Sequence, residues 1–562
     1  MTAPRHKLML KLLCCFILLT LSACASPVAA LTATPAPPSP TPQVKATSSS
    51  KSNVQRPTLP QARTAQPSAT PLLQGGTANL GLIGQPESLN PITESNTALR
   101  ELTPLLFDTL LHIDPHTAQL QPGLAESWEY SRDGREVTFH LPADLTWSNG
   151  TPLTAAAIAA SLKATEHPAL AAFSQINALD PQTLKLTFAR IDCAAVTTLA
   201  QLPLIPAAQI LNPIPIGSGP FRVVEWSENK RILTLTRNPN YHGSPPPLDG
   251  LTVRFLASDE AAIALSEGHF DLVGPIQAGG DEHNTITNHP LPNYLNLAYP
   301  APHMLYLAIN YAPRNEEPLS AEVRRALYLA LDREAILAQT LNGDGQLLAG
   351  SLLPDHWAAQ DNLSWPDYDP VEARRKLAQA GFRDSDNDGW LDQAGQRIDL
   401  SIRLNSDNPL HQNLGWLISS YYRDVGLFAR AEGVSADNII DDLFTHDFSL
   451  ALYSWPLLPD PDQRMFWQAS ESSEGFGLNV TSYNNPKLDE LLNRVVAAPG
   501  CEVADRAKVY DEIQKILVTE RPVDFLLTPN RHLFATSRLH GLQPSPFAPF
   551  TWNVTEWYSQ EK

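Results

Sequence analysis

The strongest constraint on the fold is an abrupt change in composition near residue 75. Residues 25–74 contain no aromatic and no acidic residue, and they are dominated by Pro, Ala, Thr, Ser and Gln. Such a segment buries too little apolar surface to offset the entropy lost on folding. From Gly76 onward, apolar runs, aromatic residues and turn residues alternate. The sequence therefore predicts a disordered tether over residues 24–75, followed by a large folded part.

The segment before the tether has the order of an export signal. Three basic residues within the first eleven precede an apolar run over residues 12–21, which is too short to span a bilayer. The run ends in Leu21-Ser22-Ala23-Cys24, which resembles the lipobox of bacterial lipoproteins. We expect a signal peptide over residues 1–23 and lipid attachment at Cys24. The protein would then lie outside the cytoplasm and touch the membrane only through its lipid anchor.

The charge of the chain narrows the class of partner. It carries 59 acidic and 40 basic residues, for a formal net charge of −19, and the residues before position 75 include no acid. The folded part is therefore strongly acidic. Phosphate backbones repel such a surface, because their binding needs clustered Lys and Arg. Nucleic acid is not expected as a partner.

The folded part mixes strand and helix signals. Alternating apolar residues predict strands over residues 77–83, 137–141, 233–236 and 251–255. Helical spacing of apolar residues follows Ser320, which is a plausible N-cap, and Asp369-Pro370, and it returns around Tyr510. This mixture predicts an α/β protein of at least two lobes.

Two cysteines, Cys193 and Cys501, lie in the folded part. Export permits a disulfide between them. The sequence alone does not place their Cα atoms within bonding distance, so a disulfide and two separate thiols both stay open.

Short motifs follow one another along the folded part. They include Pro86-Glu87-Ser88-Leu89-Asn90-Pro91, Leu106-Phe107-Asp108-Thr109-Leu110, Pro122-Gly123-Leu124-Ala125-Glu126-Ser127-Trp128, Gly217-Ser218-Gly219-Pro220-Phe221, Arg237-Asn238-Pro239-Asn240-Tyr241 and Ala378-Gln379-Ala380-Gly381-Phe382. In this order they resemble the family 5 extracellular solute-binding proteins of ABC transporters, the oligopeptide, dipeptide and nickel-binding group. The resemblance runs from about residue 81 to about residue 527.

The resemblance implies a two-lobed α/β fold of the periplasmic-binding-protein type, class II or cluster C, with an extra inserted domain. The two lobes of such a protein close on a ligand like a hinged trap. We expect lobe I to comprise residues 76–118, 195–300 and 523–562, the inserted domain residues 119–194, and lobe II residues 301–522.

The resemblance also implies ligand contacts. In the peptide binders, a segment of the type Trp-x-x-Asp-x-x-Asp-Pro supplies a stacking ring and a carboxylate that pairs with the peptide's α-ammonium group. Here Trp455 is followed three positions later by Leu458, so this aspartate is missing. We expect ligand contacts from Tyr453, Trp455 and Leu458, and also from Gln85 and Pro86, which follow the first predicted strand.

The sequence contains few patterns that are typical of enzymes or metal sites. Gly-x-Ser-x-Gly, His-Glu-x-x-His and Walker motifs are missing from the sequence, so we expect no enzyme activity, no cofactor and no metal site. Asp384, Asp386 and Asp388 resemble the start of a calcium loop. Position twelve of that loop is Gly395 and not a bidentate Glu, which favours a solvated turn.

These observations lead to one hypothesis with two alternatives. A lipid-anchored monomer would capture an oligopeptide or a similar solute and deliver it to the permease subunits of an ABC importer. Leu458 favours the first alternative, a receptor for a non-peptide solute such as a sugar, an opine or a nickel complex. The second alternative is a surface sensor that binds a ligand without transport.

Overall fold

The computed structural model describes residues 75–560, apart from 288–290, 315–317, 361, 365–366, 474 and 476. The predicted signal peptide, Cys24 and almost all of the predicted tether lie outside these residues. Within them, helices and strands are mixed, which confirms the predicted α/β class. No helix in this part of the chain is long and apolar enough to cross a membrane.

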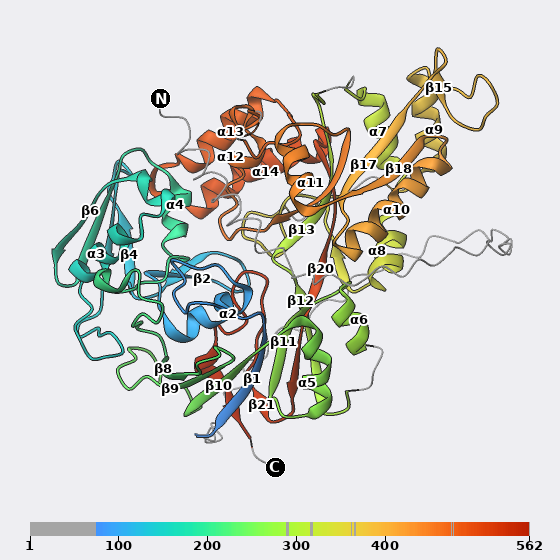
Figure 1. Ribbon diagram of the computed structural model, residues 1–562. Coiled ribbons are helices and arrows are strands. Elements are labelled where there is room, and N and C mark those ends of the chain that lie inside the picture. The colour runs from blue at the N-terminus through green and yellow to red at the C-terminus, as the bar shows by residue number, and fades with distance from the viewer. Residues whose placement is uncertain are drawn as a thin grey trace, which may run out of the picture. The chain divides into compact units, whose positions relative to one another are not determined.

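Twelve strands form one large sheet, which consists of two groups that share a strand (Figure 1). The first group is β1 (Thr77–Ile83), β8 (Phe221–Trp226), β9 (Ile232–Arg237), β10 (Gly250–Leu256), β11 (Leu272–Gln277) and β12 (Tyr294–Pro300). The second group is β13 (His303–Ile309), β14 (Gly345–Leu347), β17 (Asp399–Asn405), β18 (Phe428–Val434) and β19 (Leu450–Pro456).

The shared strand is β20 (Val523–Thr536). Its first half, from Val523 to Leu527, pairs with β13, and its second half, from Asn530 to Thr536, pairs with β12 and β11. The chain also passes from the first group to the second between β12 and β13. The predicted lobe boundaries at residues 300 and 523 thus fall at the β12–β13 link and at the start of β20, a strand that serves both groups.

Helices cover both groups of strands. They are α2 (Thr97–Leu106), α5 (Ala261–Glu267), α6 (Asp281–Thr287), α7 (Ala321–Leu329), α8 (Arg333–Leu341), α9 (Pro370–Gln379), α10 (Pro409–Asp424), α11 (Ala436–Phe444), α12 (Arg464–Trp467), α13 (Pro486–Val496) and α14 (Val503–Glu520). Both N-caps predicted from the sequence are present in the structure. The side chain of Ser320 accepts a hydrogen bond from Val323 N, and that of Asp369 accepts one from Glu372 N.

A separate four-stranded sheet lies within the predicted inserted domain. Its order is β4 (Ser127–Tyr130), β5 (Glu136–His140), β7 (Thr183–Phe188) and β6 (Phe173–Asp180). α3 (Ala155–Thr165) buries Ile158 and Leu162 in the same core, and α4 (Cys193–Thr198) adds Val196. This core extends to Leu204, past the predicted end of the domain at residue 194.

Three short two-stranded sheets complete the described strands. They are β2 (Leu111–Ile113) with β3 (Leu120–Pro122), β15 (Asp392–Gln393) with β16 (Gln396–Arg397), and β21 (Leu539–His540) with β22 (Tyr558–Ser559).

The inserted sheet is joined to helices of the second group. Cys193, at the start of α4, forms a disulfide with Cys501, which lies between α13 and α14, and their Cα atoms are 5.4 Å apart. Beside it, the carboxylate of Asp192 pairs with the guanidinium of Arg464 at 2.9 Å. The disulfide therefore ties two segments that are 308 residues apart in the sequence.

Gly217, from one of the family-like motifs, has a packing role. A Cβ atom at this position would lie 1.9 Å from the carbonyl oxygen of Leu106, at the end of α2. Only glycine permits so close an approach of two backbones. This motif therefore holds the loop before β8 against α2.

Candidate functional site

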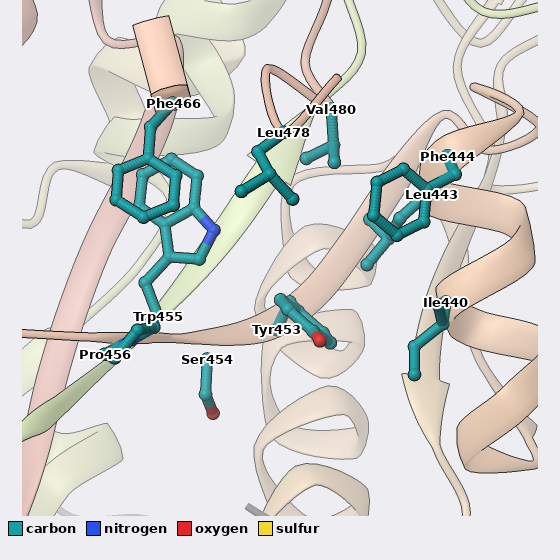
Figure 2. Close-up of a pocket in the computed structure, with 10 residues that line it drawn as sticks. All are labelled: Ile440, Leu443, Phe444, Tyr453, Ser454, Trp455, Pro456, Phe466, Leu478 and Val480. Carbon is teal, nitrogen blue, oxygen red and sulfur yellow. The ribbon is translucent and has the colours of Figure 1, made fainter. Parts of the chain in front are cut away.

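β19 carries two of the predicted ligand residues. Alternation along the strand sends Tyr453 and Trp455 to one face and Ser454 to the other, as Figure 2 shows. The indole of Trp455 is only 5% exposed. It stacks on Phe466 with ring centroids 4.3 Å apart and lies beside Tyr306 at 4.4 Å. Trp455 therefore belongs to the aromatic core of the second group in this structure.

A small apolar pocket lies beside these rings (Figure 2). It is lined by Ile440, Leu443, Phe444, Tyr453, Ser454, Trp455, Pro456, Phe466, Leu478 and Val480. Its volume is about 30 Å³, and a cavity needs roughly 10–15 Å³ to hold one water molecule. The pocket thus has room for about two water-sized groups, enough for a small apolar side chain but not for a whole solute.

The other predicted ligand residues lie at the ends of strands. Leu458 follows β19 and is 38% exposed. Gln85 follows β1 and is exposed, whereas Pro86 is buried. The amide of Gln85 donates to the carbonyl oxygen of Asn229 at 3.1 Å. Ligand contact by these five residues stays a prediction.

The acid closest to Leu458 in sequence is already engaged. Both carboxylate oxygens of Asp460 accept hydrogen bonds from the guanidinium of Arg506, at 3.0 and 3.1 Å, and one of them also accepts from Thr197. A carboxylate held by a buried arginine is not free to bind a ligand amine. Asp460 therefore does not replace the aspartate that is missing at position 458.

A second set of residues, which we call the arginine pair group, was not predicted from the sequence. It consists of Arg100 in α2, Arg531 in β20, His303 at the start of β13 and His411 in α10. The charges of Arg531 and Arg100 both act on His303, and His411 does so as well. Two of these residues come from each predicted lobe, so the group lies where the predicted lobes meet.

Neither arginine of this group has an acidic partner within 4 Å among the described residues. Glu101 is the nearby acid that acts on Arg100, but one of its oxygens accepts a hydrogen bond from Phe550 N at 2.7 Å. Burial lowers the pKa of the Arg100 guanidinium; Glu101 opposes this shift, and Arg531 adds to it. Two guanidiniums with one shared acid leave an excess of positive charge, which favours an anion.

The two histidines do not add to this charge at neutral pH. Burial lowers the pKa of His303 to about 3, and the nearby Arg531 contributes to the shift. Burial also lowers the pKa of His411 to about 4. Both rings are therefore neutral, and His411 Nε2 lies 3.2 Å from the hydroxyl of Ser454 on β19. The positive charge of the group rests on the two arginines.

His411 gives a prediction for the pH dependence of stability. The pKa of an unfolded histidine is about 6.5, so the depressed folded value makes stability complete above that pH and lets it fall as the pH drops toward 4. At pH 5 the loss amounts to about 2 kcal/mol, at roughly 1.4 kcal/mol per pH unit. In urea unfolding at pH 7.5 and pH 5, we expect His411→Gln to remove about that much of the wild-type loss.

The matched control is His269→Gln, because the His269 side chain is 77% exposed. This variant should follow the wild-type pH dependence. An equal pH dependence in the His411→Gln protein would contradict a neutral buried ring.

Comparisons with known proteins identify the class of the chain. Residues 119–476 match the model of the bacterial extracellular solute-binding proteins, family 5. The oligopeptide-binding protein AppA of Bacillus subtilis is 24% identical over 524 residues, which cover 88% of this chain and 93% of that protein. The probable D,D-dipeptide-binding periplasmic protein DdpA of Escherichia coli is 24% identical over 508 residues, which cover 84% and 93% of the two chains.

Solved structures give the same result for the fold. The structure of AppA in complex with a nonapeptide aligns with a TM-score of 0.66 at 22% identity and covers 87% of this chain and 100% of that one. NikZ of Campylobacter jejuni in complex with Ni(L-His) aligns with a TM-score of 0.68 at 23% identity and covers 86% and 99%. These neighbours confirm the predicted two-lobed fold. On the match of well over half of its length, this chain belongs to family 5 of the bacterial extracellular solute-binding proteins.

Proposed function

We propose that this protein binds a solute with a carboxylate or another anionic group between its lobes and delivers it to an ABC importer. The observation that carries the proposal is the arginine pair group, in which Arg100 and Arg531 lack an acidic partner within 4 Å among the described residues. Guanidinium and carboxylate match each other in charge and in hydrogen-bond geometry. In a chain with a net charge of −19, two arginines without such a partner form a specific anion site and not a general surface property.

An oligopeptide is the first candidate solute. Its terminal carboxylate would pair with the arginines, and a small apolar side chain would fit the pocket beside Tyr453 and Trp455. The solute would then contact Gln85, Pro86 and Leu458 at the ends of β1 and β19. The similarity to the oligopeptide-binding protein AppA supports this class.

A non-peptide anion is the second candidate, and one observation favours it. Position 458 lacks the aspartate, and the two acids that follow it are engaged: Asp460 pairs with Arg506, and Asp462 pairs with Arg464. No free carboxylate in this described loop is available for a peptide amine. An opine or a metal chelate, recognised by its carboxylates, needs no such partner.

We expect native mass spectrometry of the purified protein to find a bound solute that carries at least one acidic group. Masses separated by amino-acid residues would identify a peptide receptor, and one small chelate or opine would identify the second candidate. A neutral sugar or a cation without an acidic group would contradict the proposal. The protein should be purified without denaturation, because unfolding releases the ligand.

A second experiment tests the proposed role in transport. Cells that lack the gene should take up the identified solute more slowly than the parent strain. Unchanged uptake would indicate a sensor. Membrane attachment rests on Cys24, so a Cys24→Ser variant should appear in the soluble extracellular or periplasmic fraction.

A further inference from the structure

A cluster of three side chains that are not part of the arginine pair group has the composition of a metal site. His283 lies in α6, Asp344 directly precedes β14, and His532 lies in β20. One oxygen of Asp344, Oδ2, is 3.1 Å from His283 Nε2 and 2.7 Å from His532 Nε2. One ligand atom from each residue can be chosen so that all three lie within 4.8 Å of one another. A single ion can therefore reach all three.

Both histidines are buried, with 7% and 3% exposure for His283 and His532. Neither ring nitrogen of His283 makes a hydrogen bond within the described part of the chain, and the same holds for Nε2 of His532. The contact that both rings do make is with Asp344 Oδ2, which lies within ion-pair distance of the two Nε2 atoms. Buried polar atoms rarely lack a hydrogen bond, and a bound metal ion is one established way to satisfy them.

The surroundings orient these ligands as the neighbours of a metal site do. Nδ1 of His532 lies 2.8 Å from Oδ1 of Asn296, and the amide of Asn530 donates to Oδ1 of Asp344 at 2.9 Å. If Nδ1 donates its hydrogen to Asn296, Nε2 directs its lone pair toward Asp344, whose oxygen is also an acceptor. A cation between the two atoms satisfies both of them.

We propose that His283, Asp344 and His532 bind one divalent transition-metal ion, with zinc as the best match. Two imidazole nitrogens and one carboxylate oxygen suit zinc, and water would fill the remaining position. His532 follows Arg531 directly in β20, but the two sets share no residue, and this site does not depend on the proposed function. Because His283 and His532 belong to predicted lobe I and Asp344 to predicted lobe II, the ion would link the lobes beside their shared strand.

The test is zinc binding by the purified full protein without a polyhistidine tag, after removal of bound metal with a chelator. Competition with a chromophoric chelator should show one zinc ion per chain. Asp344→Asn and His532→Gln should each weaken this binding at least 100-fold. Asp386→Asn is the matched control, because Asp384, Asp386 and Asp388 are an exposed carboxylate cluster that should not hold the ion.

A second measurement does not depend on whether the variants fold. Copper(II) added to the wild-type protein in equimolar amount should show coupling to two imidazole nitrogens in electron paramagnetic resonance. No zinc binding by the wild-type protein, binding that Asp344→Asn and His532→Gln leave unchanged, or a copper spectrum without imidazole nitrogens would each overturn the proposal.

Discussion

Replacing both Arg100 and Arg531 with methionine should weaken solute binding at least 100-fold while lowering the thermal midpoint of unfolding only slightly. A hydrogen bond to a charged group contributes about 1.5–3 kcal/mol, so two lost partners weaken binding by roughly 100- to 10,000-fold. Stability should fall much less than affinity. Burial and Arg531 already disfavour the charged form of Arg100, and the buried carboxylate of Glu101, on which both arginines act, keeps its hydrogen bond from Phe550 N. Methionine retains most of the aliphatic volume and removes this repulsion.

Isothermal titration with the solute identified by mass spectrometry measures the first effect, and calorimetric unfolding measures the second. Arg430→Met is the matched control: this arginine lies on β18, its side chain is 49% exposed, and it pairs with Asp399. The control should bind solute like the wild type. Solute affinity within threefold of wild type in the double variant would exclude the anion site. A large fall in the midpoint would instead assign the two arginines a structural role.

Many helices and strands could be predicted from the sequence, because strand alternation and helix caps each depend on only a few neighbouring residues. The alternation over residues 77–83 became β1 with the same bounds, and the caps at Ser320 and Asp369 start α7 and α9 as expected. These signals depend on backbone geometry that a short segment fixes by itself. The end of the inserted domain could not be predicted in this way, because α4 joins its hydrophobic core only through tertiary packing.

The candidate sites could be predicted only where a motif marks them. Tyr453, Trp455 and Leu458 were named as ligand contacts because their segment resembles one motif of the family, and that role stays a prediction. Arg100 and Arg531 come from opposite ends of the folded part. They meet because the second half of β20 pairs with β11 and β12 of the first group, and α2 packs into the same hydrophobic core. His283, Asp344 and His532 are likewise too far apart in the sequence to form a recognisable motif. Such sites follow from the topology of the chain, which no local pattern encodes.

Asp460→Ala should lower the free energy of unfolding by about 3–5 kcal/mol, because it leaves a buried guanidinium without its partner. The Arg506 side chain is 5% exposed and that of Asp460 is 8% exposed. The same carboxylate accepts a hydrogen bond from Thr197 of α4 at 2.8 Å, so the loss also weakens the contact between the inserted sheet and the loop after β19. Urea unfolding of the purified variant measures the effect.

A partner substitution separates the ion pair from simple loss of packing. Arg506→Met in the Asp460→Ala background removes the unpaired charge, so the double variant should recover part of the lost stability. Leu458→Ala is the control on the same loop and should change stability by less than about 0.5 kcal/mol, because Leu458 is 38% exposed. Equal stability of the single and double variants would show that Asp460 acts through packing alone. Recovery would show that the carboxylate of Asp460 serves the fold through its ion pair with Arg506 and is not held in reserve for a ligand amine.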